Sequence, residues 1–341
     1  MNRIAIEKLN DLYSRIDSAF GKVVIPVKKS GTVNYDVWSE GEEVSLKTLK
    51  TSKSPKDYFF PQSETLMKFR YDGGNISIED VREDHHPFVL FGVKACDNKS
   101  FEVLDRVFLQ DPVDTYYQSR RNACTIVTLS CANPDESCFC SAFGIDPANP
   151  SGDVETYIVN GFLYWKSLTE KGEKLTEIVS DLFEECSEDA VDGQKAKIKE
   201  TMFRLPLSNL DLSAISRLST DEMFESEKWA ELSSTCMGCG SCTFVCPTCQ
   251  CFDIRDFNTH KGTVRYRCWD SCMYKEFTQM AGGNNRTVQL QRFRQRFMHK
   301  LKYYPENNDG MFSCVGCGRC VKKCPQHLNI VKVIKSFGGV K

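Results

Sequence analysis

The chain has 341 residues, 18 cysteines and a formal net charge of −2, which conceals an acidic N-terminal part and a basic C-terminal part. Charged residues are spread through Met1 to Leu9, so the start of the chain lacks the apolar core of a secretory signal. No apolar stretch reaches the length of a membrane span. We therefore expect a cytoplasmic protein with two domains, whose reduced thiols bind metal and do not form disulfides.

Helical and strand patterns alternate through the first two-thirds of the chain. The continuous apolar runs 87–93 and 123–129 have the length of buried strands. Helices are predicted at residues 4–19, 97–109, 169–183 and 189–203, and further strands at 22–27, 35–39, 75–80 and 157–165. This alternation predicts an α+β or α/β domain over residues 1–205.

Four cysteines follow the two buried strands. Cys96 comes after the first strand and Cys131 after the second, and Cys138 and Cys140 follow within nine residues. If the strands are neighbours in one sheet, the four thiols meet and suffice for an iron–sulfur cluster, with Asp97 as a further possible ligand. The alternative is that they are small buried apolar residues.

Other candidate sites in this part of the chain are weak. The adjacent His85 and His86 precede a strand and are interpreted as part of an exposed loop. No glycine-rich dinucleotide fingerprint and no Walker A run is present. We expect the chain to bind neither flavin nor nucleotide, and no residue is nominated as catalytic.

Residues 206–235 are interpreted as a linker that ends in a short helix over 221–232, with Ser219 or Thr220 as its N-cap. This helix leads directly to the first of two cysteine runs. The runs lie in the last segment, 236–341, which we interpret as a separate domain.

Both cysteine runs have the spacing C-x-x-C-x-x-C-x-x-x-C-P, which is typical of ferredoxins that hold two [4Fe–4S] clusters. Three cysteines of a run wrap one cluster, and the fourth ligates the other cluster. The predicted ligands of the first cluster are Cys236, Cys239, Cys242 and Cys324. The predicted ligands of the second are Cys314, Cys317, Cys320 and Cys246. Structural zinc sites use paired ligands, so two runs of four fit zinc poorly.

The two runs are separated by 67 residues, more than a compact ferredoxin needs. Residues 291–304 have a basic helical pattern with Phe293, Phe297 and Leu301 on one face. We therefore expect a helical ferredoxin-like domain, in which helices and not a β-hairpin separate the cluster loops. The arginine face of this helix is interpreted as solvated surface, with partner docking as the alternative.

Four more cysteines lie between the runs, at Cys249, Cys251, Cys268 and Cys272. Packing around the clusters is the first interpretation. A further metal site formed by Cys249, Cys251 and Cys272, with His299 as an additional candidate ligand, is the second.

The basic residues from Cys236 onward number 17, against 6 acidic residues. They interleave with the cluster ligands, as Arg319, Lys322 and Lys323 do, so we interpret them as compensating anionic clusters and attracting acidic partners. Nucleic-acid binding is the alternative, but no nucleic-acid motif accompanies them.

Several motifs occur together in a recognisable order. They are Gly92-Val-Lys-Ala-Cys96-Asp97, Cys138-Phe-Cys140, Cys246-Pro-Thr-Cys249-Gln-Cys251, Trp269-Asp-Ser-Cys272, Met280-Ala-Gly-Gly-Asn284 and the final Cys314-Val-Gly-Cys317-Gly-Arg-Cys320. Over roughly residues 55–335 the chain resembles the iron–sulfur β-subunit of cytoplasmic sulfhydrogenases, and the corresponding iron–sulfur subunit of anaerobic sulfite reductases is similar.

The resemblance implies an electron-transfer subunit of a soluble anaerobic oxidoreductase. Such a subunit relays electrons between a flavin- and [2Fe–2S]-bearing NAD(P)H-type subunit and a catalytic hydrogenase or sulfite or sulfur reductase subunit. It also favours a third cluster at Cys96, Cys131, Cys138 and Cys140. The alternative function is an iron–sulfur reductase with its own substrate site at that N-terminal cluster.

Overall fold

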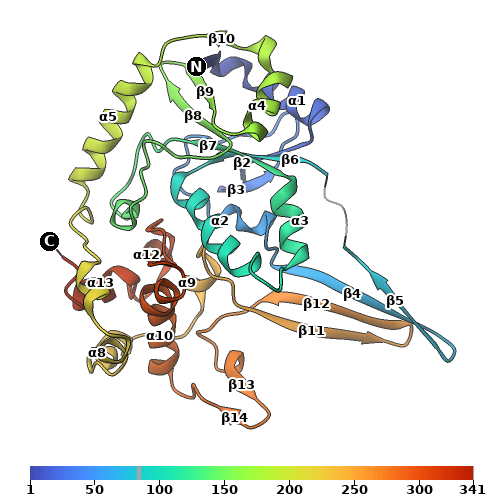
Figure 1. Cartoon of the computed structure of the whole chain (residues 1–341), viewed down its shortest axis with the longest axis vertical. Coiled ribbons are helices and arrows are strands. Elements are labelled where there is room, and N and C mark those ends of the chain that lie inside the picture. Colours follow the sequence, from blue (N-terminus) through green and yellow to red (C-terminus); the bar gives the residue numbers. More distant parts are fainter. Residues whose placement is uncertain (83–85, 341) are drawn as a thin grey trace.

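The computed structural model describes residues 1–82 and 86–340 (Figure 1). The exposed-loop interpretation of the adjacent histidines lies in part outside these residues, since only His86 is described, and it is exposed. None of the described helices is long and apolar enough to cross a membrane.

An eight-stranded mixed sheet forms the N-terminal part. In spatial order its strands are β10 (Glu184–Glu185), β1 (Asn2–Ala5), β9 (Phe162–Ser167), β8 (Val154–Val159), β7 (Cys124–Leu129), β6 (Phe88–Val93), β2 (Lys22–Lys29) and β3 (Thr32–Val37). The four strands β2, β6, β7 and β8 are parallel neighbours, and the other pairings are antiparallel. The predicted strands 22–27, 87–93 and 123–129 are thus confirmed.

Helices cover both faces of this sheet (Figure 1). Alternate residues of a strand point to opposite faces: Val89 packs with α1 (Leu9–Ala19) and α4 (Glu170–Ile178), whereas Leu90 packs with α2 (Ala95–Phe108) and α3 (Thr115–Ala123). Burial on both faces explains why the central strands read as continuous apolar runs. A further helix of this part is α5 (Asp189–Arg204).

Two element predictions in this part need correction. The helix predicted from residue 4 begins only at Leu9, because Asn2–Ala5 pairs with β9 as a strand and this tertiary pairing overrides the local helical spacing. The single strand predicted over 157–165 is a hairpin of β8 and β9, with Asn160 and Gly161 in its turn. Gly161 adopts a positive φ of 83°, which glycine tolerates best.

A second sheet of four strands projects from the body as an arm (Figure 1). Its strands are β11 (Phe252–Thr259), β12 (Gly262–Trp269), β4 (Ser63–Asp72) and β5 (Asn75–Asp80). Both the β11–β12 hairpin and the helix α10 (Gln289–Met298) lie between the two cysteine runs, so the expectation that helices and not a β-hairpin separate them is correct only for the second half of the insert. The hairpin pairs with β4, a contact too distant in sequence for local patterns to reveal.

The remaining helices pack around a second core that includes Trp229, Phe293, Phe297 and Phe337. They are α6 (Ser213–Arg217), α7 (Thr220–Phe224), α8 (Lys228–Ser233), α9 (Ser241–Phe244), α10 (Gln289–Met298), α11 (Tyr304–Glu306), α12 (Arg319–Lys323) and α13 (Ile330–Ser336). Short 3-10 turns are η1 (Ile6–Lys8), η2 (Pro55–Tyr58), η3 (Cys140–Phe143), η4 (Ser180–Leu182) and η5 (Glu276–Thr278), and the strand pair β13 (Gln279–Met280) and β14 (Gly283–Asn284) completes the fold.

The predicted helix over 221–232 is two short helices, α7 and α8. Ser219 caps α7 in a capping box with Glu222, as one of the two predicted caps. The Trp229 indole donates a hydrogen bond to the Met223 carbonyl at 2.6 Å, which fixes the bend between the helices. The basic helix predicted over 291–304 is present as α10, continued by a π-helical segment over His299–Tyr303.

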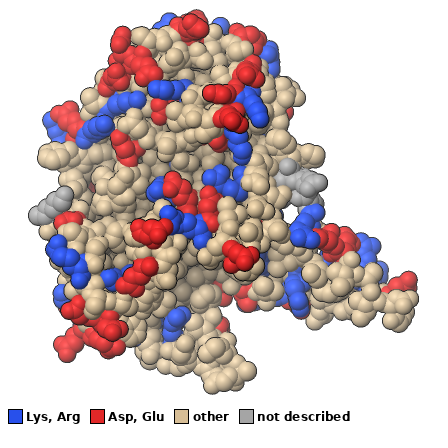
Figure 2. Space-filling model, viewed as in Figure 1, with Lys and Arg blue, Asp and Glu red and all other residues tan. Residues whose placement is uncertain are grey.

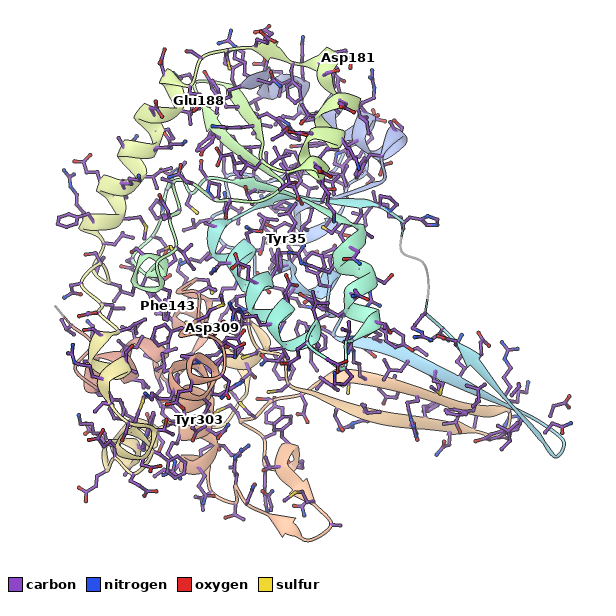
Figure 3. All side chains as sticks on the ribbon, in the orientation of Figure 1. Tyr35, Phe143, Asp181, Glu188, Tyr303 and Asp309 are labelled. Atoms are coloured by element: carbon purple, nitrogen blue, oxygen red, sulfur yellow. The ribbon has the colours of Figure 1, made fainter. Side chains whose placement is uncertain are left out.

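The two parts of the chain contact each other directly. Phe143 meets Phe312 edge to face with ring centroids 5.7 Å apart, and Arg106 pairs with Asp309 at 2.8 Å (Figure 3). These contacts join segments that are more than 160 residues apart in the sequence. The loop that carries Cys138 and Cys140 therefore lies against the C-terminal part.

A buried charge network holds the arm to the body. The Arg267 guanidinium on β12 donates to Glu64 at 2.6 Å and to Asp114, and it lies over the ring of Phe60. Arg267 and Glu64 are both nearly inaccessible to water. Removing one member of such a network leaves an uncompensated buried charge.

We predict that Arg267→Met destabilises the protein by about 3–5 kcal/mol, because Glu64 and Asp114 would lose their buried cation. Thermal unfolding of the anaerobically purified protein measures this as a lower Tm. Arg255→Met is the matched control, since Arg255 pairs with Asp253 on the exposed surface of the same sheet. An unchanged Tm for the Arg267 variant would contradict the prediction.

Candidate iron–sulfur cluster sites

The first cavity is lined by four cysteines: Cys236, Cys239, Cys242 and Cys324. Cys236 and Cys239 come from the loop that leads into α9, Cys242 lies in α9 itself, and Cys324 follows α12. Gly240 allows the loop to turn here, since it has a φ of 72° and an added Cβ would lie 2.6 Å from the Tyr274 hydroxyl. The walls of the cavity also include Phe293, Arg296 and Phe297 of α10.

The second cavity is lined by the other predicted set: Cys246, Cys314, Cys317 and Cys320. Its remaining walls include Phe139, Arg296 and Lys300. Each cavity thus combines three cysteines of one run with the last cysteine of the other run. The fold brings together the two groups of four that the spacing predicts, and their role as iron ligands is taken up as a proposal below.

The N-terminal cysteines follow the geometry that the sequence suggested. Strands β6 and β7 are parallel neighbours, so their carboxyl ends meet at one edge of the sheet. Cys96 lies in the first turn of α2, just after β6, and Cys131 lies just after β7. Burial raises the pKa of the Cys140 thiol, and the neighbouring Cys131 and Cys138 raise it further. A raised pKa means that the buried thiols do not ionise easily as free side chains. A cationic metal centre between them would favour their thiolate form.

Asp97 is not available as a ligand in this arrangement. Both of its oxygens accept hydrogen bonds from Arg319, at 2.6 and 2.7 Å, and both residues are buried. The Arg319 Nε also donates to the Thr51 carbonyl at 3.1 Å. The interpretation of Asp97 as a further ligand is therefore replaced by a structural role, in which it neutralises an arginine of the second cysteine run.

The N-terminal thiols lie directly beside the second cavity. The Phe139 amide donates to the Gly316 carbonyl at 3.1 Å, and Cys140 packs in one cluster of buried side chains with Cys317. A Cβ on Gly316 would lie 2.5 Å from the Phe139 carbonyl carbon, so only glycine permits this approach. The second cavity therefore adjoins the N-terminal thiols and, through Arg296, also the first cavity.

Arg296 is the residue that the two cavities share. It is almost fully buried, its Nη2 donates to the Cys242 carbonyl at 3.0 Å, and its Nε and Nη1 have no hydrogen-bond partner among the described residues. Lys300, one turn later, is also buried and donates to Thr248 Oγ1 and to the Ser313 carbonyl, both at 2.9 Å. Two buried cations thus adjoin the sulfur-lined cavities, and a buried cation requires nearby negative charge.

Burial of Arg296 and Lys300 corrects the interpretation of this helix face as solvated surface. The sequence already indicates this burial, because Arg296 and Lys300 lie on the same face of the helix as its apolar residues. These apolar residues are Phe293, Phe297 and Leu301. A charged residue on an apolar stripe next to cysteine runs indicates a partner of opposite charge in the interior.

The additional cysteines pack in pairs beside the second cavity. The Cys272 thiol donates a hydrogen bond to Cys251, which lowers the pKa of Cys251 to about 7. The Cys249 thiol donates to Cys246 in the same way, and this lowers the pKa of Cys246. Lys56 lies nearby, with its Nζ 2.7 Å from the Cys249 carbonyl. Among residues 1–82 and 86–340, no three His, Cys, Asp or Glu side chains are arranged to hold a single metal ion. The further metal site at Cys249, Cys251 and Cys272 stays a prediction.

Two other residues lie apart from these thiols. The Cys268 thiol on β12 has Arg255, Asp253 and Asp270 as its charged neighbours, and burial raises its pKa. Burial lowers the pKa of His299 to about 4, and its charged neighbours are Lys300 and Arg286. Neither residue joins the group formed by Cys249, Cys251 and Cys272.

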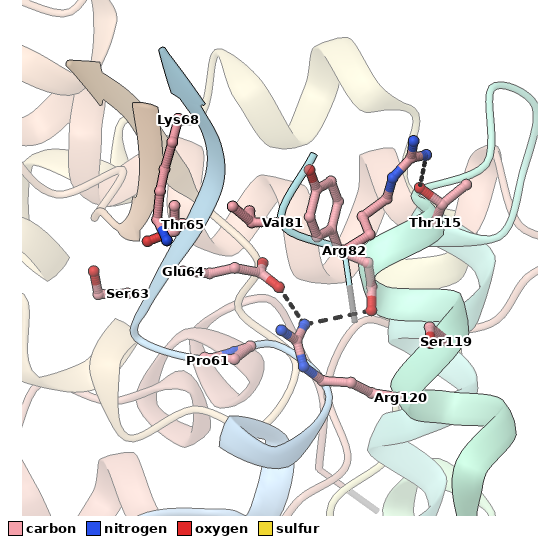
Figure 4. Close-up of a pocket in the computed structure, with 11 residues that line it drawn as sticks. Pro61, Ser63, Glu64, Thr65, Lys68, Val81, Arg82, Thr115, Ser119 and Arg120 are labelled. Atoms are coloured by element: carbon pink, nitrogen blue, oxygen red, sulfur yellow. Dashed lines mark hydrogen bonds and ion pairs between the residues drawn. The ribbon is translucent and has the colours of Figure 1, made fainter. Parts of the chain in front are cut away.

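A larger cavity of about 540 Å³ lies at the junction of the arm and the body (Figure 4). It contains no cysteine. Glu64 points toward Arg120, which is also directed at the Tyr116 carbonyl, and Arg82 contacts Thr115. Glu64 is paired with both Arg120 and Arg267, so this cavity borders the structural network around Arg267 and is distinct from the cysteine sites.

Comparison with known proteins defines the class of this site. A family model described as a 4Fe–4S dicluster domain matches residues 235–328, which include both cysteine runs. The C-terminal part is therefore a 4Fe–4S dicluster domain.

The whole chain is 33% identical over 333 residues to the sulfhydrogenase 2 subunit beta of Pyrococcus furiosus. The match covers 96% of this chain and 95% of that protein. The chain belongs to the sulfhydrogenase β-subunit family, as its motifs predicted. No solved structure matches it significantly.

We predict that Arg296→Gln lowers the reduction potentials of both clusters of the dicluster domain, because each reduced cluster would lose a buried positive charge and its N–H donors. Redox titration followed by EPR measures the shift. Arg294→Gln is the control, since Arg294 lies two residues away on the same helix and bonds the Phe224 carbonyl instead. Equal potentials in the Arg296 variant and the unaltered protein would contradict the role assigned to Arg296.

Proposed function

We propose that this protein is the electron-transfer subunit of a soluble, cytoplasmic, multi-subunit oxidoreductase, and that it relays electrons through [4Fe–4S] clusters. The observation that carries the proposal is the pair of four-cysteine cavities that share the Arg296 side chain as a wall. A cluster in each cavity would have four thiolates and no open iron, so the pair is suited to passing electrons and not to binding substrate.

The proposed ligands are those predicted from the runs. Cys236, Cys239, Cys242 and Cys324 hold one cluster, and Cys314, Cys317, Cys320 and Cys246 hold the other. The helical ferredoxin-like interpretation of this domain remains part of the proposal. It is supported by α9 and α12, which each carry the third cysteine of a run and contact each other.

A third [4Fe–4S] cluster at Cys96, Cys131, Cys138 and Cys140 extends the relay to the edge of the large sheet. Its support is the parallel pairing of β6 with β7 and the packing of Cys140 against Cys317. Electrons would then pass between the N-terminal cluster and the cluster of the first cavity through the cluster of the second cavity, and no covalent bond would form or break.

The buried charges fit this role. Arg319 is neutralised by Asp97 and Lys322 pairs with Asp135, so these two residues contribute less net positive charge than the sequence suggested. Arg296 and Lys300 bond only neutral oxygens in the described part of the chain. Their charge is therefore available to stabilise a cluster as it gains an electron.

The partners are proposed from the family. The relative's name identifies it as one subunit of a sulfhydrogenase, so a complex is expected here as well. We propose a flavin-containing NAD(P)H-type subunit on one side of the relay and a catalytic subunit, such as a hydrogenase or a sulfite or sulfur reductase, on the other. This chain itself would bind no flavin or nucleotide.

We predict that Cys320→Ser removes one cluster and stops electron flow through the complex, while a flavin-bearing partner still reduces a small dye with NAD(P)H. The serine oxygen is a poor replacement for a thiolate on iron. Iron content, EPR and turnover of the complex measure the effect. Cys268→Ser should leave all three unchanged, because Cys268 lines neither cavity. Unaltered overall turnover in the Cys320 variant would argue against the relay.

We predict about twelve iron atoms per chain in the anaerobic protein, and about eight when Cys131→Ser removes the N-terminal cluster. Iron and sulfide analysis with EPR of the reduced protein gives the count. Cys124→Ser is the control, since Cys124 is buried within β7 on the face that packs with α2 and α3. About eight iron atoms in the unaltered protein would exclude the third cluster.

One observation favours the alternative, a reductase with its own substrate site. A cavity of about 200 Å³ borders Cys131 and is also lined by Lys47, Lys94 and Asn133. A cation and an amide beside a cluster could receive a small anion. The isolated chain, supplied with a chemical reductant, would then reduce such an anion without partners, whereas a pure relay would not.

A further inference from the structure

One edge of the relay is open to solvent. Cys239 is the only exposed cysteine of the 18, all of which the structure describes. The loop that carries it also exposes Met237, an apolar side chain with 63% of its surface accessible. Since electrons leave or enter a relay where a centre comes near the surface, this loop marks the place where a redox partner must approach.

A short hairpin borders this loop. The Tyr274 hydroxyl donates to the Cys239 carbonyl at 3.3 Å, and the Gln289 amide donates to Cys236 Sγ at 3.5 Å. The chain between these two anchors, residues 275–288, forms the β13–β14 hairpin, which projects from the lower end of the molecule (Figure 1). Both of its ends are therefore attached to the rim of the first cavity.

Side-chain hydrogen bonds stabilise the conformation of the hairpin. Asn284 donates from its side chain to the Lys275 carbonyl at 2.6 Å and accepts from Thr278 at 2.8 Å. Arg292 of α10 donates to the Met273 carbonyl at 3.1 Å and to the Arg286 carbonyl at 3.0 Å, which fixes both ends of the hairpin. A surface ordered in advance loses less entropy when a partner binds.

The hairpin surface has the composition of an interface core. Residues 277–285 contain no charged side chain. Met280 and Val288 have 59% and 53% of their surface accessible, and Figure 2 shows the projecting tip almost free of Lys, Arg, Asp and Glu. Depletion of charge and enrichment of methionine distinguish the centre of protein–protein interfaces from the rest of a protein surface.

We propose that the loop 236–240 and the hairpin 275–288 form the docking surface for one redox partner subunit of the complex. The partner is a protein that carries a flavin or an iron–sulfur centre close beneath an apolar, uncharged patch. Contact with Met237, Met280 and Val288 would exclude water and bring that centre next to the cluster of the first cavity. This inference rests on the proposed function, since a docked partner needs a cluster to exchange electrons with.

The test uses the complex that co-purifies with the tagged chain under anaerobic conditions. Hydrogen exchange of residues 236–240 and 275–288 is compared between the cluster-loaded chain alone and the complex, and slower exchange in the complex is expected. A photo-crosslinker at position 280 should label a subunit that contains flavin or iron. Unchanged exchange at both segments, or crosslinking only to a second copy of this chain, would overturn the docking surface.

The variant Met280→Glu places a charge at the centre of the surface. We expect unchanged iron content and unchanged reduction by dithionite, with at least a tenfold loss of complex recovered and of electron transfer to the partner. Phe203→Glu is the control, because Phe203 is 83% exposed at the end of α5. Normal assembly of the Met280 variant, or equal loss in both variants, would refute the inference. Absence of clusters or of any complex from the unaltered chain would instead refute the proposed function.

Discussion

Compensation of buried charge is the constraint on which the cysteine sites depend. Arg296, Lys300 and Arg319 carry positive charge into an interior lined by sulfur. Arg319 meets its partner within the chain, Asp97, whereas Arg296 has N–H groups without a partner among the described residues. A buried guanidinium in that position is stable only opposite an anion. Anionic clusters in the two adjoining cavities would supply that charge, and the cations would in turn favour the reduced clusters.

The same constraint ties the two parts of the chain together. The Arg319–Asp97 ion pair joins α12 to α2, and the Phe139–Gly316 hydrogen bond joins the two cysteine-bearing loops beside it. The sheet edge of the N-terminal part therefore borders the same sulfur-rich interior as the loops of the dicluster domain. Electron transfer through this interior would need no movement of either part, because packed side chains fix the separation of the sites.

Sequence reasoning succeeded where local patterns carry the information. The cysteine spacing predicts the same two groups of four thiols that line the two cavities. The apolar runs predict the neighbouring strands β6 and β7, whose ends place Cys96 and Cys131 at one edge of the sheet. Sequence reasoning failed where contacts between segments far apart in the chain determine the structure. Pairing with β4 stabilises a hairpin, β11–β12, in the part of the insert that precedes the expected helix, and burial of Arg296 depends on what lies opposite that helix. Asp97 was interpreted as a ligand because it follows Cys96 in the sequence. Its actual partner, Arg319, lies 222 residues further along the chain, so the ion pair could not be predicted from local sequence.

The arm has a consequence for dissecting the molecule. Its strand β4 belongs to the first half of the chain, whereas its neighbour β12 belongs to the second. A gene divided near residue 205 would yield two pieces, each with an unpaired strand edge and with either Arg267 or Glu64 stripped of its counter-ion. Open edges of this kind invite aggregation. The halves should thus be soluble only when produced together, as complementing fragments that meet before either has finished folding.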